Sequence, residues 1–174
     1  QKLRSLTPGE VCTLPGFSKA NDDTLPPEQD RRITEAPDLV LFEGWCVGTP
    51  PQDESTLAEP VNELERDEDA DGRWRGYVNQ QLGSIYATWF TELDALVHLR
   101  VPGWTEVRAW RAQQEHETAA RHKGRSALLD DARRERFLLH YQRLTLHALQ
   151  ALPSTADAML EIDHEHEILG LRQL

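Results

Sequence analysis

The sequence predicts an α/β fold in which a parallel sheet is flanked by helices. Short apolar runs bounded by turn residues are typical of strands that are buried on both faces of such a sheet. Between these runs lie longer segments whose apolar residues recur every three or four positions, as on one face of a helix. This alternation favours strands joined by helical crossovers. We expect strands near residues 11–14, 39–42, 95–101 and 158–162, and helices over 71–93, 104–122 and 130–152.

The composition is that of a soluble globular domain. The chain has 174 residues, of which 39% are hydrophobic and 28% are charged, so we expect one domain over residues 1–174. A net charge of −11 argues against a nucleic-acid or anionic membrane surface, and no apolar run reaches the length of a membrane span. Cys12 and Cys46 form no CxxC pair, which favours reduced thiols in a cytoplasmic protein.

The strand expected at residues 39–42 is followed at once by Glu43 and Gly44. In open α/β sheets, ligands bind at the carboxyl ends of the strands. Gly44 permits a sharp turn or a close approach of the backbone to a ligand. A carboxylate at this position can hold Mg²⁺ through water or take a proton from an attacking hydroxyl. The structural alternative is that Glu43 caps the next turn, and the local pattern leaves both open.

Two polar segments flank this stretch. Lys19 lies in the loop 15–23, where it can meet an anionic group, although a solvated surface loop is the interpretation that the residues favour. Residues 53–71 are strongly acidic, as solvated faces often are. The run at 67–72 approaches the spacing of a calcium-binding loop but lacks its distal glutamate, so we do not expect calcium there.

The first long helix is expected to begin at Asp71, a good N-cap residue. Arg73 and Arg75 follow at the start of the helix, where cations oppose the helix dipole, and this indicates an anionic neighbour in the acidic segment or in a substrate. The apolar stripe predicts a core-facing side. Its members are Trp74, Val78, Leu82, Ile85, Trp89 and Leu93.

Further along, the residues give mostly structural signals. His98 lies inside an expected strand, where a hydrogen-bonded structural histidine is the favoured interpretation. On the helix 104–122, Arg111 and Glu115 are spaced as a surface salt bridge. The run that begins at His116 starts like a zinc-protease motif but lacks the second histidine, which excludes zinc. The cluster 163–167 can bind a metal or line a ligand cleft, and we favour the cleft.

The sequence contains several long and distinctive strings. The central string is LFEGWCVG at 41–48. The other strings are LAEPVNELE at 57–65, GRWRGYVN at 72–79, LRVP at 99–102, WRAQQE at 110–115 and HYQRLT at 140–145. Together they strongly resemble the D-glycerate 3-kinases, which are P-loop kinases related to uridine and pantothenate kinases. The likeness covers most of residues 10–166 in the same order.

The resemblance implies a P-loop NTPase-like kinase fold and ATP-dependent phosphorylation of D-glycerate with Mg²⁺. By likeness, Glu43 is the catalytic carboxylate at the strand end, beside the metal and the reacting hydroxyl. Residues 104–125 form a lid that closes on the phosphates. The remaining residues then divide into substrate-binding Lys19, Arg73 and Asn79, and nucleotide-binding Arg108, Arg111, Gln114, Asp163 and His164.

The chain also departs from the family pattern. Ser18 stands where the family usually has Asp, and Gly16 where it often has Arg. These two departures change the side chains that the family's substrate loop offers to the substrate. No G-x-x-x-x-G-K-[ST] occurs in the 174 residues. That loop cradles the ATP phosphates, so we expect the isolated chain, as the C-terminal part of a kinase, to be inactive. The alternatives are a kinase for another small hydroxylated metabolite and a non-catalytic α/β module that has lost phosphate binding.

Overall fold

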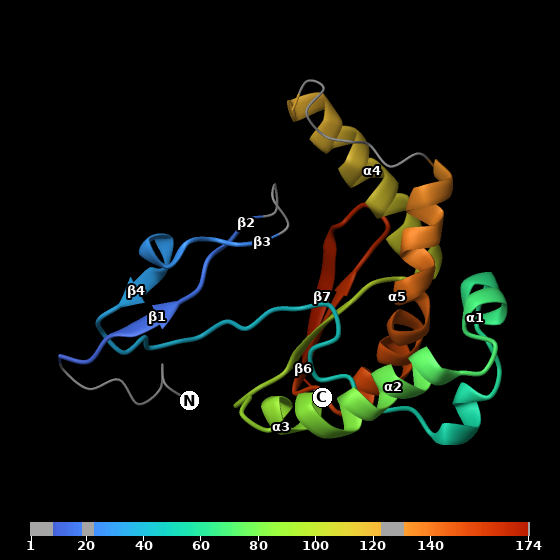
Figure 1. Ribbon diagram of the computed structural model, residues 1–174, viewed down its shortest axis with the longest axis horizontal. Coiled ribbons are helices and arrows are strands. Elements are labelled where there is room, and N and C mark those ends of the chain that lie inside the picture. The colour runs from blue at the N-terminus through green and yellow to red at the C-terminus, as the bar shows by residue number, and fades with distance from the viewer. Residues whose placement is uncertain (1–8, 19–22, 123–130, 174) are drawn as a thin grey trace. The chain divides into compact units, whose positions relative to one another are not determined.

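The computed structural model describes residues 9–18, 23–122 and 131–173 (Figure 1). Lys19, which we expect to bind the substrate, lies outside these residues. The chain divides into two compact units, residues 1–43 and 44–174, and each is described by itself. The expectation of one domain over the whole chain stays a prediction.

Two short antiparallel ladders make up the described part of the first unit. Strand β1 (Cys12–Leu14) pairs with β4 (Arg31–Ile33), and β2 (Phe17–Ser18) pairs with β3 (Asp23–Thr24). The 3₁₀ turn η1 (Pro27–Gln29) lies between β3 and β4 in the sequence. The strand expected near 11–14 therefore exists. Its expected place in a parallel sheet is wrong, because its partner β4 runs antiparallel to it.

The buried strand expected at residues 39–42 is also wrong. These residues have no regular secondary structure, and Leu41 is 87% exposed. Apolar character makes a run suitable for a buried strand, but a strand also needs neighbours that supply ladder hydrogen bonds and cover its side chains. No strand in the described part of the chain pairs with this run.

The second unit contains a mixed three-stranded sheet in the order β5–β6–β7. Strands β5 (Val97–Arg100) and β6 (Ala158–Ile162) are parallel, which confirms two of the expected strands and their direction. Strand β7 (Ile168–Gln173) returns antiparallel to β6 and was not predicted. The sheet is therefore mixed and not wholly parallel.

Two long helices connect β5 to β6, as a parallel pair of strands requires. They are α4 (Trp104–His122) and α5 (Asp131–Ala151), which lie side by side (Figure 1), and the 3₁₀ turn η4 (Leu152–Ser154) ends α5. The expected helices 104–122 and 130–152 are confirmed. Among the described residues, no helix is long and apolar enough to cross a membrane.

The helix expected over 71–93 is present as one helical stretch in three parts. It comprises α2 (Arg73–Gln81), the π-helical turn η3 (Leu82–Tyr86) and α3 (Ala87–Phe90). Before it come the 3₁₀ turn η2 (Glu54–Leu57) and helix α1 (Glu63–Glu68). The expected core-facing stripe is largely wrong, because only Leu82 of its members is fully buried, whereas Trp74 is 70% exposed.

The core of the second unit is formed by side chains of η3, α5, η4 and β6 and of the short segment between η4 and β6. Its buried apolar side chains are Leu82, Leu138, Leu144, Ala148, Leu152, Ala156 and Met159. His98 is buried as expected, but its Nδ1 has no hydrogen-bond partner among the described residues. Burial, with Arg100 nearby, lowers the pKa of His98, so the neutral imidazole is favoured.

Candidate functional site

A buried arginine fixes the loop that precedes α2. Asp69 accepts hydrogen bonds from the backbone N–H groups of Trp74 and Arg75, at 2.8 and 3.1 Å. The Arg75 guanidinium pairs with the same carboxylate at 3.0 Å, and it also donates to the carbonyl oxygens of Leu57 and Ala58. Asp69 thereby caps α2, so the expected N-cap role of Asp71 is wrong; the residue at the N-cap position is Gly72, with φ of 72°.

A second buried arginine, Arg143 on α5, holds the segment before α1. Its guanidinium binds both oxygens of Glu65, at 2.8 and 2.6 Å, and donates to the carbonyl oxygens of Thr56 and Glu59. Glu65 also accepts from the Val61 N–H at 3.0 Å. The two arginines thus bind four carbonyl oxygens of residues 56–59 and anchor this stretch to α2 and α5.

These two carboxylates make stability sensitive to acid. Burial by itself raises the pKa of Asp69, but the hydrogen bonds from Trp74, Arg75 and the Arg75 guanidinium outweigh it and lower that pKa. The pKa of Glu65 is lowered in the same way: burial raises it, and the contacts with Arg143 and Val61 outweigh the rise.

We expect the free energy of unfolding to fall with acid through these two groups. A carboxyl whose pKa is lower in the folded state stabilises that state fully above its unfolded pKa, about 4, and loses this contribution as pH falls through the folded pKa. Urea unfolding between pH 7 and pH 3 measures the loss. Asp69→Asn is expected to be less stable at pH 7 and to show a shallower decline below about pH 4. An unchanged slope would contradict the link to Asp69.

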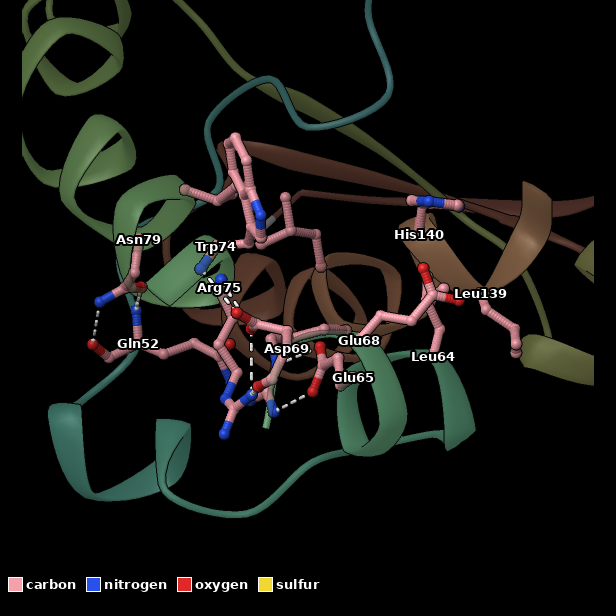
Figure 2. A pocket seen from close by; sticks show the side chains of 13 residues that line it. Gln52, Leu64, Glu65, Glu68, Asp69, Trp74, Arg75, Asn79, Leu139 and His140 are labelled. Atoms are coloured by element: carbon pink, nitrogen blue, oxygen red, sulfur yellow. Dashed lines mark hydrogen bonds and ion pairs between the residues drawn. The ribbon is translucent and has the colours of Figure 1, made fainter. Parts of the chain in front are cut away.

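A pocket of about 430 Å³ lies between α1, α2 and α5, with Asp69, Arg75 and Glu65 on one side (Figure 2). Its apolar walls are Leu64, Trp74, Val78, Leu139 and Leu144. All three nitrogens of each arginine already bind carbonyl or carboxylate oxygens. The polar groups here hold the fold together, and we assign the pocket no part in catalysis.

Two residues that the sequence suggests for substrate binding lie on α2. The Asn79 side chain accepts from the Gln52 N–H at 2.6 Å and donates to the Gln52 carbonyl at 2.9 Å (Figure 2). Asn79 therefore fixes the chain before η2. Arg73 lies at the start of α2 with its side chain 86% exposed and 4.0 Å from Asp71. The acidic segment thus supplies the anionic neighbour that the sequence indicated.

Helix α4 carries the three residues expected in the lid. Arg108 forms an ion pair with Glu135 of α5 at 2.6 Å. Arg111 pairs with Glu115 at 3.3 Å, which confirms the expected salt bridge, and its guanidinium lies 5.4 Å from the centre of the Phe137 ring. Arg111 also donates to Gln114 at 2.7 Å. Arg108 and Arg111 are thus partly exposed and held beside α5.

The residues 163–167 form the turn between β6 and β7. Asp163 Oδ1 accepts from the N–H groups of Glu165 and Glu167, at 2.8 and 2.9 Å, so its carboxylate shapes the turn. Trp110 of α4 donates from its indole to the His164 carbonyl at 3.2 Å and lies against the His166 ring at 4.2 Å. This turn therefore contacts α4, and its His164 side chain is exposed.

Glu43 is the last residue of the first unit, and it is exposed. It follows the irregular run 39–42 and precedes the turn at 45–48, in which Gly48 has φ of 78°. Among the described residues, no group of three or more His, Cys, Asp or Glu side chains is placed to hold a metal ion.

No protein family model matches the chain. Over 94 residues, half of this chain, it is 37% identical to the uncharacterized kinase mug58 of Schizosaccharomyces pombe, and the match covers 31% of that protein. The solved D-glycerate 3-kinase of Cryptococcus neoformans var. grubii matches 94% of this chain with a TM-score of 0.74 and 21% identity. The YGR205w protein matches 98% with a TM-score of 0.65 and 21% identity. The chain has the fold of a D-glycerate 3-kinase.

The predicted resemblance to the D-glycerate 3-kinases is thus confirmed in the fold. This chain spans 60% of the length of each solved structure and 31% of the kinase from S. pombe. For Arg75, sequence reasoning indicated an anionic neighbour, and Asp69 of the acidic segment is that neighbour. It gave no role to Arg143, although both arginines lie in strings that carry the resemblance. Arginines in otherwise apolar helical stretches were the available signal, because such residues are buried only when they are paired.

Proposed function

We propose that this chain supplies part of a kinase that transfers the γ-phosphoryl group of ATP to a hydroxyl of D-glycerate. The observation that carries the proposal is the shared fold with a D-glycerate 3-kinase over 94% of the chain, together with 37% identity to a kinase over half of it. The free thiols Cys12 and Cys46 agree with a reducing compartment, and we place the reaction in the cytoplasm.

In the proposed reaction, a hydroxyl oxygen of D-glycerate attacks the γ-phosphorus of ATP. The bond between that phosphorus and the oxygen bridging to the β-phosphate breaks, and ADP leaves. Glu43 takes the proton of the attacking hydroxyl, a role open to an exposed carboxylate. Because phosphoryl transfer depends mainly on positioning and electrostatics, the phosphates also need nearby cations.

The partly exposed guanidinium groups of Arg108 and Arg111 are the cations that we assign to the phosphates, with Gln114 beside them. Each is held by a carboxylate, at 2.6 and 3.3 Å. Binding of a phosphate therefore requires exchange of these partners. For Arg108 this costs little, because the side chains of Arg108 and Glu135 are 49% and 38% exposed and exposed ion pairs contribute about 0–1 kcal/mol. The Glu115 side chain is only 11% exposed, so Arg111 gives up a largely buried partner. Asp163 and His164 we assign to the nucleotide through the turn that contacts Trp110 of α4.

We also assign Mg²⁺ to Glu43. Proteins usually hold Mg²⁺ with one or two carboxylates, and waters and the substrate phosphates complete the octahedron. A single exposed carboxylate, Glu43, meets that need without a cluster of protein ligands. Bound Mg²⁺ neutralises charge on the phosphates during transfer.

We expect Arg111→Ala to lower kcat/KM for ATP-dependent transfer by roughly tenfold to a hundredfold, because a cation is removed from the developing phosphoryl charge. The assay uses the longest natural product of the gene. Gln113→Ala, on the same helix and exposed, is the control and should leave kcat/KM unchanged. Thermal unfolding of both variants separates a loss of phosphate binding from loss of the contacts with Glu115 and Phe137. An unchanged kcat/KM for Arg111→Ala would mean that Arg111 only forms the salt bridge with Glu115.

The acceptor is tested directly with D-glycerate, L-glycerate, glycerol and D-lactate. The proposal predicts that ADP forms only with D-glycerate and that ³¹P NMR shows a phosphate monoester of it. Turnover of a different acceptor alone would favour the second candidate, a kinase for another hydroxylated metabolite. That candidate is supported by Gly16 and Ser18, which depart from the substrate loop of the family.

A non-catalytic module is the third candidate. The absence of a G-x-x-x-x-G-K-[ST] run from the 174 residues favours it. It predicts no ADP formation with any acceptor, even in the longest natural product.

A further inference from the structure

The pocket between α1, α2 and α5 is set apart from the residues that we assign to phosphoryl transfer. Its lining comes from these three helices, from Asp69 at the end of α1 and from Gln52 before η2. Among the described residues that line it, none belongs to α4 or to the turn 163–167. Asn79 lines it, but its side-chain amide is bonded to the Gln52 backbone. Its volume of about 430 Å³ is typical of small-molecule sites.

The charged groups of the lining favour a cation as ligand. Each nitrogen of Arg75 and Arg143 already binds a carbonyl or carboxylate oxygen. Against these two guanidinium groups stand three lining carboxylates, those of Glu65, Glu68 and Asp69. An anionic ligand therefore meets committed donors and an excess of negative charge, whereas the carboxylates attract a cation.

Glu68 and His140 lie together on one side of the pocket, where they offer acceptors (Figure 2). The Nδ1 of His140 lies 3.0 Å from the Arg136 carbonyl oxygen. A carbonyl oxygen only accepts, so Nδ1 carries the proton, and Nε2 of the neutral ring is an acceptor. Glu68 pairs with Arg136, and both side chains are 52% exposed. Because such an exposed pair contributes little, a bound cation can replace Arg136 beside Glu68.

A further acceptor, on the other side of the pocket, has no partner. The Oε1 atom of Gln52 is buried, and among the described residues no group donates to it. Buried polar atoms without a hydrogen bond are rare in folded proteins, so this oxygen calls for a donor from water or from a ligand. A ligand that spans the pocket can supply this donor at its end opposite the cation.

Apolar side chains line the pocket between these two polar sides. They are Leu64, Trp74, Val78, Leu139 and Leu144. The Trp74 side chain adds an aromatic face that attracts cations, and Trp74 is 70% exposed. The lining thus combines an apolar middle with acceptors at both ends.

We propose that this pocket binds a small organic cation: a protonated amine or amidine on an apolar or aromatic body, with a hydrogen-bond donor at its far end. The cationic group lies beside Glu68 and His140, and the donor bonds to Gln52 Oε1. The apolar body packs against the walls of the pocket. The proposal assigns a ligand other than ATP and glycerate, which are anions, and it does not depend on the proposed kinase activity.

The test is an NMR titration of the longest natural product of the gene with three probes of one skeleton. Tyramine carries an ammonium group and a phenol O–H. Phenethylamine lacks the O–H, and 3-(4-hydroxyphenyl)propionate has a carboxylate in place of the ammonium group. We expect saturable binding of tyramine, binding of phenethylamine about fivefold weaker because one hydrogen bond is lost, and binding of the propionate at least about tenfold weaker.

Four variants locate the probe. Glu68→Gln should weaken tyramine binding at least about fivefold, whereas Glu63→Gln, an exposed carboxylate of the same helix, is the control and should leave it unchanged. Gln52→Leu should remove the advantage of tyramine over phenethylamine. Val78→Trp fills the pocket and should abolish binding of all three probes; Val78 is 38% exposed, so the larger side chain has room. Thermal unfolding verifies that each variant is folded.

Three results would overturn the proposal. Absence of saturable tyramine binding at millimolar concentrations would leave the pocket to water. Equal affinities for tyramine and the propionate would contradict a cationic ligand. Tyramine binding that survives Val78→Trp would place the probe outside the pocket. None of these readouts requires catalysis, so failure of the kinase assay leaves this test intact.

Discussion

Glu43→Gln is expected to lower kcat of the longest natural product by roughly 10²–10⁴-fold, the usual contribution of a positioned acid–base group. Glutamine keeps the size of the side chain and removes its charge. Glu43 is exposed, so the fold should be unaffected. If the carboxylate also holds Mg²⁺, the variant will need more Mg²⁺ for half-maximal rate. The measurement is kcat for D-glycerate across a Mg²⁺ titration.

Asp38→Asn is the matched control, since Asp38 is an exposed carboxylate in the same irregular segment. Its kcat should be normal. The 174-residue chain alone should form no product above background, because it has no phosphate-binding loop to hold the γ-phosphate in line with the acceptor. A Glu43→Gln enzyme with near-normal kcat would reduce Glu43 to a structural role. An active 174-residue chain would show that other residues bind the phosphates.

Arg75→Met is expected to destabilise the chain by about 3–5 kcal/mol, as removal of one partner of a buried ion pair usually does. The substitution keeps much of the apolar stem and deletes the guanidinium. It leaves the buried Asp69 carboxylate without its cation, and it leaves the carbonyl oxygens of Leu57 and Ala58 without their donor. Urea unfolding of the 174-residue chain at pH 7 measures the loss.

Arg73→Met is the control on the same helix. The Arg73 side chain is 86% exposed, whereas that of Arg75 is 5% exposed, so Arg73→Met should change stability by about 0.5 kcal/mol or less. Similar values for the two variants would mean that Arg75 does not anchor residues 57 and 58. Arg143→Met should resemble Arg75→Met, because Arg143 makes the equivalent contacts with Glu65, Thr56 and Glu59.

The helices and the β5–β6 pair could be predicted because their signals are local. Periodicity of three to four residues located α2–α3, α4 and α5, and a short apolar run bounded by Pro102-Gly103 located β5. Strand β7 was missed because its run contains Gly170 and follows a cluster that indicated a ligand loop. Its pairing with β6 depends on the turn that Asp163 closes by accepting from Glu165 and Glu167, and spacing alone did not indicate this turn.

The candidate site was only partly accessible from the sequence. The Arg111–Glu115 pair followed from helical spacing. The roles of Asn79 and Asp69 did not, because the groups that they bind lie elsewhere in the sequence: the Gln52 backbone for Asn79, and the start of α2 for Asp69. The functional roles stay predictions for all the site residues that the resemblance implies: Lys19, Glu43, Arg73, Asn79, Arg108, Arg111, Gln114, Asp163 and His164.

The sequence by itself determined the helical segments, the parallel pair β5–β6 and the likeness to the D-glycerate 3-kinases, because these depend on residue order over short stretches. Only the tertiary structure decided which apolar residues are buried. Residues 39–42 and Leu99 are as apolar as Met159, yet of these side chains only that of Met159 is buried. A side chain is buried only where other elements pack against it. Its hydrophobicity indicates that burial would stabilise the fold, but it does not indicate which elements lie nearby.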